Sequence, residues 1–489
     1  MTVVYDVAII GCGPVGATLA NLLERQGRRV VVIDQFADAY PLPRATHIDG
    51  EALRILQTAG VADMLSPHLG IYSRMRFEDA DGKLLIDWPR SVEPGIHGWR
   101  DSNRFHQPDL ESALRKRAAD VSGIDLRLGW TVTEIAQNED AVKISTIAPD
   151  GGTEILSARF AVGCDGARSS VRQAIGAEVQ TLAPSEQWLV ADLILGPDAP
   201  ELPEGTVQYC DPARPITYIE AVGRRRRWEV MLLPGDDPVD FATPDRVYAL
   251  LDRWLAPEDA ELERAVVYTF NSVIASQWRK GRLLIAGDAA HQTPPFLGQG
   301  LCAGLRDAAN LSWKLAWVLN GRATPALLDT YQTELAPHVT QYIAEANRIG
   351  AIIQERDPER ARVRDATLLA RPQVLVPIRP RVGDEAVGSS LAGTLAPQPR
   401  LSDGRLIDDA APLGFVLLGR AALLDQVDPA TRAIWARADV TVFPDEALDY
   451  LDMIDADAVL IRPDHYILGT ARTAQELDTL TRTIPLAAG

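Results

Sequence analysis

The chain has 489 residues and a formal net charge of −18 at pH 7, with 46% hydrophobic and 24% charged residues. This length exceeds one ordinary hydrophobic core and predicts two or three domains. The acidic balance disfavours nucleic acid and anionic membranes as partners, and no apolar run approaches the roughly 18 residues that a membrane span needs.

Cysteine and histidine usage narrows the chemistry. Cys12, Cys164, Cys210 and Cys302 form no CxxC pair, so the sequence supports neither a redox dithiol nor a metal knuckle. Seven histidines without an HExxH motif disfavour a metal site. The N-terminus shows no basic segment and no cleavage site of a secretory signal. We expect a metal-free protein of the reducing cytoplasm.

The first 33 residues predict a β-α-β unit. Residues 3–10 are apolar and β-branched, which is typical of a buried strand. Residues 14–26 predict a helix, and residues 29–33 predict a second strand. Such a unit implies a parallel sheet.

The turn between that strand and helix reads GCGPVG. Gly11 permits the tight turn, Gly13 lets the backbone approach a pyrophosphate, and Gly16 lets the helix pack closely on the strand. Asp34 ends the second strand, where a carboxylate binds both ribose hydroxyls and repels a 2′-phosphate. The turn predicts a tightly bound dinucleotide other than NADP, and a glycine turn without a ligand is the alternative interpretation.

Further elements follow along the chain up to residue 180. Helices are predicted near residues 50–62 and 107–120, and strands near residues 124–134, 140–147 and 154–163. The last of these strands ends in VGCDGARSSVR, where Asp165 and Gly166 precede Arg168 and Arg172. Taken alone, this segment fits a strand-end turn with a solvated basic helix equally well.

The pattern changes in residues 181–275, which are rich in strands such as WLVADLIL, PITYIEAV and RRWEVMLL. We interpret them as an antiparallel sheet inserted into a first domain that comprises residues 1–180 and 276–370. Residues 371–400 are rich in Pro, Arg and Gly and predict a linker. Residues 401–489 alternate strand and helix patterns and predict a small α/β domain.

The stretch GDAAHQTPPFLGQG, residues 287–300, lies between a short apolar strand and a long helical pattern. Its glycines and adjacent prolines make a rigid turn with little side-chain bulk, which favours a ligand close to the backbone. Asp288 can bind sugar or ribityl hydroxyls. The N–H groups of Leu301 and Cys302 begin the helix and favour negative charge, such as the N1–C2=O edge of a reduced flavin.

These three motifs, in this order, resemble the single-component flavin-dependent aromatic hydroxylases of the para-hydroxybenzoate hydroxylase type over residues 4–365. PLPRATHIDGEALRILQ, NRFHQPDLE and QYCDPARP are similar to the branch with 3-(3-hydroxyphenyl)propionate hydroxylase and polyketide hydroxylases. The resemblance implies an α/β fold with a Rossmann-like FAD-binding domain, an inserted antiparallel-sheet substrate domain and a C-terminal thioredoxin-like domain. That last domain lacks CxxC here, and Asp34 stands where the family often has Glu.

The resemblance also implies the residues that hold FAD. Arg44 would contact FAD close to the flavin, Gln107 its ribityl or phosphate region, and Asp288 a ribityl hydroxyl. Asp165 and Gly166 match a motif linked to both FAD and NAD(P)H. The full implied set of cofactor residues is Gly11, Gly13, Pro14, Val15, Gly16, Asp34, Gln35, Arg44, Gln107, Asp165, Gly166, Gly287, Asp288, Pro295, Gly298, Gly300, Leu301 and Cys302.

The implied reaction takes hydride from NADH or NADPH to FAD, adds O2 to give a flavin C4a-hydroperoxide, and transfers one oxygen to a phenolic ring. Pro294 and Pro295 would wall the oxygen-reaction site. A base should deprotonate the phenol. Arg44, His47 and Tyr209 are candidate catalytic residues, and Arg214 could bind a substrate carboxylate. Ordinary packing or surface exposure is the alternative for each.

The substrate and the assembly stay open. We expect a 3-hydroxyphenylpropionate-like phenolic acid or another small phenol, with a polycyclic polyketide as the alternative. A halogenase, a flavin dehydrogenase and a non-catalytic flavin-binding sensor are competing hypotheses, and the absence of a WxWxIP signature disfavours the halogenase. The protein is expected to act as a monomer or homodimer.

Overall fold

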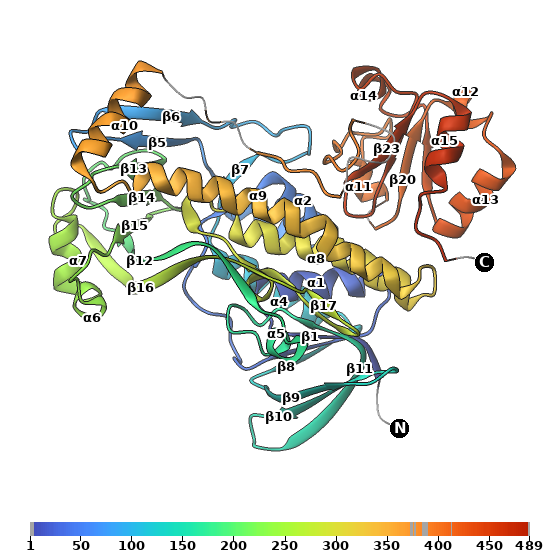
Figure 1. Cartoon of the computed structure of the whole chain (residues 1–489), viewed down its shortest axis with the longest axis horizontal. Coiled ribbons are helices and arrows are strands. Elements are labelled where there is room, and N and C mark those ends of the chain that lie inside the picture. The colour runs from blue at the N-terminus through green and yellow to red at the C-terminus, as the bar shows by residue number, and fades with distance from the viewer. Residues whose placement is uncertain (1–3, 372–374, 376–377, 384–389, 412, 488–489) are drawn as a thin grey trace.

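The computed structural model of the chain describes residues 4–371, 375, 378–383, 390–411 and 413–487. Figure 1 shows two large sheets, two long helices that lie across them, and a C-terminal body drawn in orange and red. The fold is mixed α/β, as the sequence predicts. Within the described residues, no helix is long and apolar enough to cross a membrane.

The first sheet has the predicted β-α-β unit at its centre. Its strands are β1 (Val4–Ile10), β2 (Val30–Asp34), β8 (Ile124–Leu128), β9 (Thr131–Gln137), β10 (Val142–Ile147), β11 (Thr153–Gly163), β17 (Arg279–Lys280) and β18 (Leu283–Ile285). The order is β17-β18-β11-β1-β2-β8, and β9 and β10 extend the sheet beside β11. β1 pairs in parallel with β11 and β2, so the predicted parallel sheet is confirmed.

Helices pack against this sheet, which is why its central strands β1 and β2 are apolar and almost wholly buried. The helices of this part of the chain are α1 (Pro14–Glu24), α2 (Gly50–Thr58), α3 (Ala62–Leu65), α4 (Gln107–Asp120), α5 (Ser170–Ile175), α8 (Gly300–Leu319), α9 (Thr330–Ile353) and α10 (Pro358–Ala370). α1 packs between α4 and α8. The helix predicted over residues 50–62 is two helices, because the chain turns at Gly60, whose φ is +81°.

The second sheet forms the roof over the first. Its strands are β5 (Arg74–Glu78), β6 (Leu84–Pro89), β12 (Val179–Leu195), β13 (Thr206–Tyr209), β14 (Ile216–Glu220), β15 (Arg225–Met231), β16 (Ala260–Ala275) and β19 (His291–Gln292). The order is β19-β16-β12-β15-β14-β13-β5-β6. The long strands β12 and β16 pair antiparallel along their length and connect the two sheets.

The roof sheet is larger than the inserted segment that we predicted. β5 and β6 come from the range assigned to the first domain, and β5 pairs in parallel with β13. The roof is therefore a mixed sheet. A small third sheet, β3 (His47–Asp49), β4 (Gly70–Ile71) and β7 (Ser102–Arg104), lies close by. On the far side of the roof lie α6 (Pro238–Phe241) and α7 (Pro244–Leu251).

The C-terminal body has its own four-stranded sheet. Its elements are β20 (Val416–Gly419), β21 (Thr441–Pro444), β22 (Ala458–Ile461), β23 (Ile467–Ala471), α11 (Ile407–Ala410), α12 (Ala421–Leu424), α13 (Pro429–Ala438), α14 (Leu448–Met453) and α15 (Ala474–Thr481). The strand order is β21-β20-β22-β23, with β20 and β21 parallel and the other pairs antiparallel.

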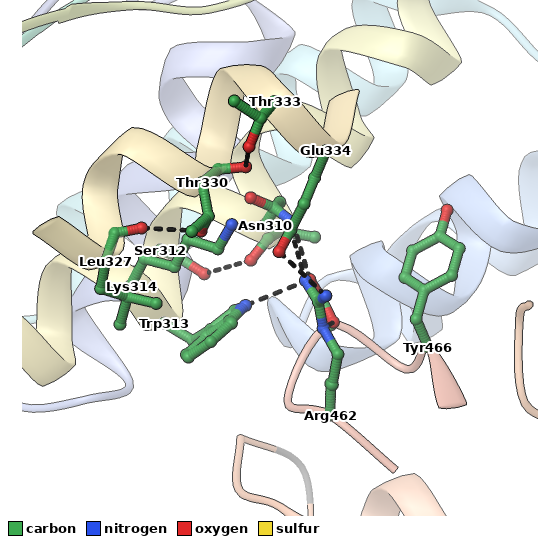
Figure 2. Close-up of polar contacts among 12 residues, drawn as sticks. Asn310, Ser312, Trp313, Lys314, Leu327, Thr330, Thr333, Glu334, Arg462 and Tyr466 are labelled. Atoms are coloured by element: carbon green, nitrogen blue, oxygen red, sulfur yellow. Dashed lines mark hydrogen bonds and ion pairs between the residues drawn. The ribbon is translucent and has the colours of Figure 1, made fainter. Parts of the chain in front are cut away.

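A buried group of polar residues joins this body to α8 and α9, and we call it the interdomain cluster (Figure 2). It consists of Asn310, Trp313, Lys314, Glu334, Arg462 and Asp464. Arg462 donates to Glu334 at 3.1 and 2.7 Å and to Asp464 at 2.9 and 2.6 Å. Lys314 donates to Glu334 at 2.7 Å. Every charge in the cluster therefore has a partner of opposite sign.

A second contact involves the range that we predicted as a linker. The fully buried Arg54 of α2 forms an ion pair with Asp408 and donates to the carbonyl oxygens of Ala396 and Pro397. The described end of the 371–400 range is thus packed between the two bodies. Residues 372–374, 376–377 and 384–389 of that prediction lie outside the described residues.

Candidate functional site

A cavity of about 380 Å³ lies between the carboxyl ends of the first sheet and the inner face of the roof. Many of the predicted residues line it together. They are Gly13, Pro14, Val15, Arg44, His47, Gln107, Gly166, Gly287, Asp288, Pro295, Gly298, Gly300 and Leu301. Parallel sheets place ligand sites at the carboxyl ends of their strands, and this cavity has that position.

The glycine turn has the geometry of a phosphate cradle. Gly11 has φ +102°, and a Cβ there would meet the Cys164 carbonyl oxygen at 2.3 Å. A Cβ on Gly16 would meet the Gly11 carbonyl oxygen at 2.0 Å. A Cβ on Gly13, in contrast, would meet nothing within 4 Å. Gly13 is the N-cap of α1 and makes no side-chain cap, so the first N–H groups of the helix border open space.

Asp34 lies beside this turn rather than in the wall of the cavity. Its carboxylate accepts from the backbone N–H of Cys12 at 2.6 Å and of Phe36 at 2.8 Å. Both bonds fix the carboxylate next to the turn and leave lone pairs for ribose hydroxyls. Gln35 follows on the exposed side of the strand end. This arrangement fits an adenosine that extends from the cavity towards β2.

The segment after β11 is braced internally. The Oδ2 atom of Asp165 accepts from the N–H of Ser170 at 2.7 Å and from its hydroxyl at 2.8 Å. The Oδ1 atom is buried and has no hydrogen-bond partner within the described residues. Gly166 lines the cavity with φ +78°, and a Cβ there would meet nothing within 4 Å. The segment therefore offers one free acceptor and open backbone next to the glycine turn.

The predicted loop at residues 287–300 crosses the floor of the cavity. Asp288 opens into the cavity but is closely surrounded by protein atoms, and this desolvation raises the pKa of its carboxyl. Behind it, the buried Asp307 accepts from the N–H of Gly287 at 2.8 Å and lies 2.7 Å from Nε2 of His291. His291 thus braces the loop from behind and does not line the cavity.

α8 begins at the end of this loop without a side-chain cap. A Cβ on Gly300 would have its nearest neighbour at 3.9 Å, and Leu301 lines the cavity. Cys302 is fully buried behind the first turn, so only its backbone belongs to this surface. The free N–H groups of a 20-residue helix make this end of the cavity favourable for negative charge.

Arg44 and Gln107 connect the floor with the roof. Oε1 of Gln107 accepts from the N–H of Arg44 at 3.1 Å and of Ala45 at 2.8 Å. Arg227 of the roof donates to the Arg44 carbonyl oxygen at 2.7 Å and to Asp192 at 2.7 Å. These bonds fix the backbone of residues 43–47, while the side chain of Arg44 stays exposed at the cavity.

The roof presents a polar inner face because side chains alternate along its strands. Glu229 pairs with Thr217, Thr217 pairs with Gln208, and all three line the cavity. Glu229 makes no side-chain hydrogen bond among the described residues, and its nearest cation, Arg227, is 3.9 Å away. Burial outweighs that cation and raises the pKa of the Glu229 carboxyl.

His47 lies where floor and roof meet. Its Nδ1 is 3.2 Å from the Gly298 carbonyl oxygen, and its buried Nε2 has no partner within the described residues. Burial lowers the pKa of His47 to about 4, so the ring is neutral at pH 7. With Nδ1 as the donor to Gly298, Nε2 is an acceptor towards the cavity.

Tyr209 and Arg214, two of the catalytic candidates, do not line this cavity. Tyr209 is on the outer face of the roof, where it accepts from Trp254 at 3.2 Å. Arg214 is tied to Asp236 at 2.7 Å. The alternation of a strand shows which residues share a face but not which face is the inner one. Pro294 borders a smaller neighbouring cavity, and Pro295 lines the main one.

Sequence reasoning missed the polar residues of the inner face and the hairpin that carries part of it. Thr217 and Glu229 alternate with Tyr218 and Trp228, so the correct phase of the same pattern would have found them. Tyr72 and Arg90 flank β5 and β6 and also line the cavity. No motif marks them. Within the described residues, no group of three or more His, Cys, Asp or Glu side chains is placed to hold a metal ion.

Known proteins resemble the chain over its full length. The probable NADH-specific resorcinol 4-hydroxylase of Rhodococcus jostii (strain RHA1) is 36% identical over 99% of this chain and 95% of its own. The 3-(3-hydroxy-phenyl)propionate/3-hydroxycinnamic acid hydroxylase of Mycobacterium sp. (strain JLS) is 34% identical over 97% of this chain and 91% of its own. These relatives confirm the resemblance to flavin-dependent aromatic hydroxylases.

The solved structure of aklavinone-11 hydroxylase in a ternary complex with FAD and aklavinone has a TM-score of 0.81 and 26% identity, and covers 99% of this chain and all of its own. The anhydrotetracycline hydroxylase OxyS of Streptomyces rimosus has a TM-score of 0.79, also at 26% identity, and covers 99% of this chain and all of its own. The FAD binding domain family matches residues 4–346, which hold the glycine turn, the loop and the roof. The chain therefore belongs to the FAD binding domain family.

Proposed function

We propose that the chain is an FAD-dependent monooxygenase that uses NADH or NADPH and O2 to hydroxylate a phenolic ring. The observation that carries this proposal is one continuous cavity with an open phosphate cradle and two uncapped helix ends on its floor, and a polar sheet face above them. Bound FAD would accept hydride from the nicotinamide and, once reduced, activate O2 for transfer of one oxygen atom.

The floor residues would bind and orient FAD. The N–H groups at the start of α1 and the backbone of Gly13 would hold the pyrophosphate, and Asp34 the adenosine ribose. Asp288 would hold the ribityl chain. The N–H groups of Leu301 and Cys302 would stabilise negative charge on the reduced ring. These roles fit the open backbone of the turn and the uncapped start of α8.

The roof would bind the phenol and take its proton. A base works best when its pKa is near the working pH, and burial moves the pKa of Glu229 upward, towards neutrality. The pKa of His47 is lowered to about 4, which makes it a weak base but a good hydrogen-bond acceptor at neutral pH. We assign proton acceptance to Glu229 and orientation of the hydroxyl to His47. Pro295, Phe296 and Leu297 are apolar wall residues that exclude water.

The substrate of this proposal is a 3-hydroxyphenylpropionate-like phenolic acid or another small phenol. A polycyclic polyketide phenol is the second candidate, because aklavinone-11 hydroxylase has the same fold over the whole chain. We further propose that the C-terminal body is a thioredoxin-like domain with a structural role, since the four cysteines of the chain lie outside it. All four are free, which fits a reducing cytoplasm.

The deciding experiment measures NADH and NADPH oxidation by the FAD-loaded protein with a panel of phenols, and quantifies peroxide and hydroxylated product. Oxidation that a phenol accelerates, with hydroxylated product, supports the proposal. Acceleration with only peroxide supports an oxygen-activating flavoprotein whose substrate is outside the panel. A slow rate that no phenol changes counts against a hydroxylase.

A further inference from the structure

Arg90 lies in the wall between two cavities. It follows β6, and its backbone N–H is fixed by the Ser73 carbonyl oxygen at 2.7 Å. The side chain lines the main cavity and also a second cavity of about 290 Å³ that reaches the C-terminal body. His47 and Leu297 complete the shared wall. A group held by Arg90 would therefore lie at the end of the main cavity, next to further space.

Aromatic rings hold the guanidinium of Arg90 in place. Its central carbon is 3.5 Å from the ring centre of Trp88 and 5.7 Å from that of Tyr72. Trp88 and Tyr72 are themselves buried, so the stack is rigid. Cation–π contacts orient a guanidinium but leave its N–H groups free for a ligand.

Arg90 makes no ion pair within the described residues, and the carboxylate of Asp101, which acts on it from a longer distance, is paired with Arg379. Its side chain makes no hydrogen bond or ion pair there, and its Nε is buried without an acceptor. Burial lowers the pKa of its guanidinium. Three other arginines that line these cavities already have carboxylate partners. Arg227 pairs with Asp192, Arg306 with Asp49 and Glu51, and Arg379 with Asp101. A half-buried cation without a counterion is costly unless a ligand supplies one.

The opposite end of the inner face carries a carboxyl instead. Glu229 is on β15 and Arg90 follows β6, at the two ends of the strand row β15-β14-β13-β5-β6. A substrate with a hydroxyl at one end and a carboxylate at the other is bound in one direction only. The hydroxyl would face Glu229, which would repel a carboxylate, and the carboxylate would face Arg90.

We infer that Arg90 binds the carboxylate of the substrate and that the chain selects phenols with an acidic side chain over neutral phenols. This inference rests on the proposed function and narrows its substrate class. A planar guanidinium forms two parallel hydrogen bonds with a carboxylate, which a neutral amide cannot reproduce. The second cavity gives room for side chains of different length.

The test compares two ligands, 3-(3-hydroxyphenyl)propionate and its carboxamide, by the absorbance change that each causes in the FAD-loaded protein. The wild type should bind the acid at least about tenfold more tightly than the amide, as expected for charge-assisted hydrogen bonds. Arg90→Gln should lose this preference while amide binding and FAD content stay unchanged. Arg90→Lys should keep part of the preference.

Arg74→Gln is the matched control, because Arg74 is on the same hairpin and pairs at the surface with Asp87. It should behave as the wild type. A wild type without preference, or an Arg90→Gln variant that keeps the full preference, overturns the inference. If neutral phenols such as resorcinol are hydroxylated as well as the acid, the inference fails and the proposed function stands. If no phenol of either kind is hydroxylated, the proposed function itself fails.

Discussion

The two ends of α8 bury polar groups in opposite ways. Along its middle and C-terminal part, the interdomain cluster pairs Lys314, Glu334, Arg462 and Asp464 with one another. At its N-terminus, the main cavity leaves the N–H groups of the helix uncapped, and Nε2 of His47 and Nε of Arg90 have no hydrogen-bond partner among the described residues.

The difference distinguishes charges that stabilise the fold from polar and charged groups that are free to bind a ligand. Buried polar groups in folded proteins are nearly always hydrogen-bonded, so each exception requires an explanation. In the interdomain cluster every charged side chain is paired with another one of the same chain. In the main cavity, His47 and Arg90 line the space where FAD and substrate are expected, and each has a buried nitrogen atom without a partner among the described residues. If the contrast holds, substitutions in the interdomain cluster should change stability, and substitutions in the main cavity should change binding.

The largest expected effect is the loss of one partner in the interdomain cluster. Arg462→Met leaves Glu334 and Asp464 buried without their shared cation and should lower the free energy of unfolding by about 3–5 kcal/mol. Urea denaturation of the FAD-loaded protein measures it. The control Arg472→Met removes an exposed arginine of the same body and should change stability by about 0.5 kcal/mol or less. A loss under about 1 kcal/mol for Arg462→Met would contradict the structural role.

A larger side chain in the main cavity should weaken FAD binding and leave the stability of the protein unchanged. Gly13→Ala puts a methyl group where no protein atom lies within 4 Å, so the apoprotein should unfold as the wild type does. FAD affinity should fall about tenfold or more, because the methyl group displaces the pyrophosphate. Fluorescence titration with FAD measures it, with Gly414→Ala in the C-terminal body as control. If Gly13→Ala binds FAD as tightly as the wild type, the glycine turn does not hold the pyrophosphate as proposed.

The interdomain cluster should also be acid-sensitive. Burial alone would raise the pKa of Glu334, but Arg462 and Lys314 outweigh it and hold the pKa well below its ordinary range. A depressed carboxyl pKa contributes stability in full above the unfolded value of about 4.3, and the contribution is lost as the pH falls below it. Between pH 4.5 and 3.5 the wild type should lose about 1 kcal/mol more than Glu334→Gln. Equal acid slopes in the two proteins would refute this assignment.

The smallest effect is expected on the outer face of the roof. Tyr209→Phe removes the 3.2 Å hydrogen bond from Trp254 and should cost about 1 kcal/mol or less in unfolding free energy. Because Tyr209 points away from the cavity, kcat/KM for the best phenol should not change. A fall of about tenfold or more in kcat/KM would place the outer face in the chemistry.

The sequence was most informative where one short motif has only one local structure. GCGPVG between an apolar strand and a helix, and the acidic end of the next strand, specify the β1-α1-β2 unit and the place of Asp34. The loop before α8 was predicted with equal success, because glycines with φ near +63° leave little choice, as Gly287 and Gly298 show. Both motifs act within a few residues of one another.

The roof was harder to predict because its inner face is assembled from distant segments. β13 pairs with β5, more than a hundred residues earlier, and the β5–β6 hairpin carries no distinctive motif. The phase of β14 and β15 decides whether Glu229 or Trp228 faces the cavity, and packing against α6 and α7 settles that phase. Such information is absent from any single window of the sequence.

The interdomain cluster has a consequence for the order of events during synthesis. Glu334 and Lys314 leave the ribosome more than 120 residues before their partner Arg462, because the contact spans 128 positions. At about 5–20 residues per second, that interval lasts roughly 6–26 seconds. For this time the ion pair of Lys314 and Glu334 and the apolar residues around it lack the cover of the C-terminal body. All residues that we propose to bind FAD, from Gly11 to Cys302, have been synthesised by then, so the proposal allows FAD to bind before the C-terminal body closes over the helices.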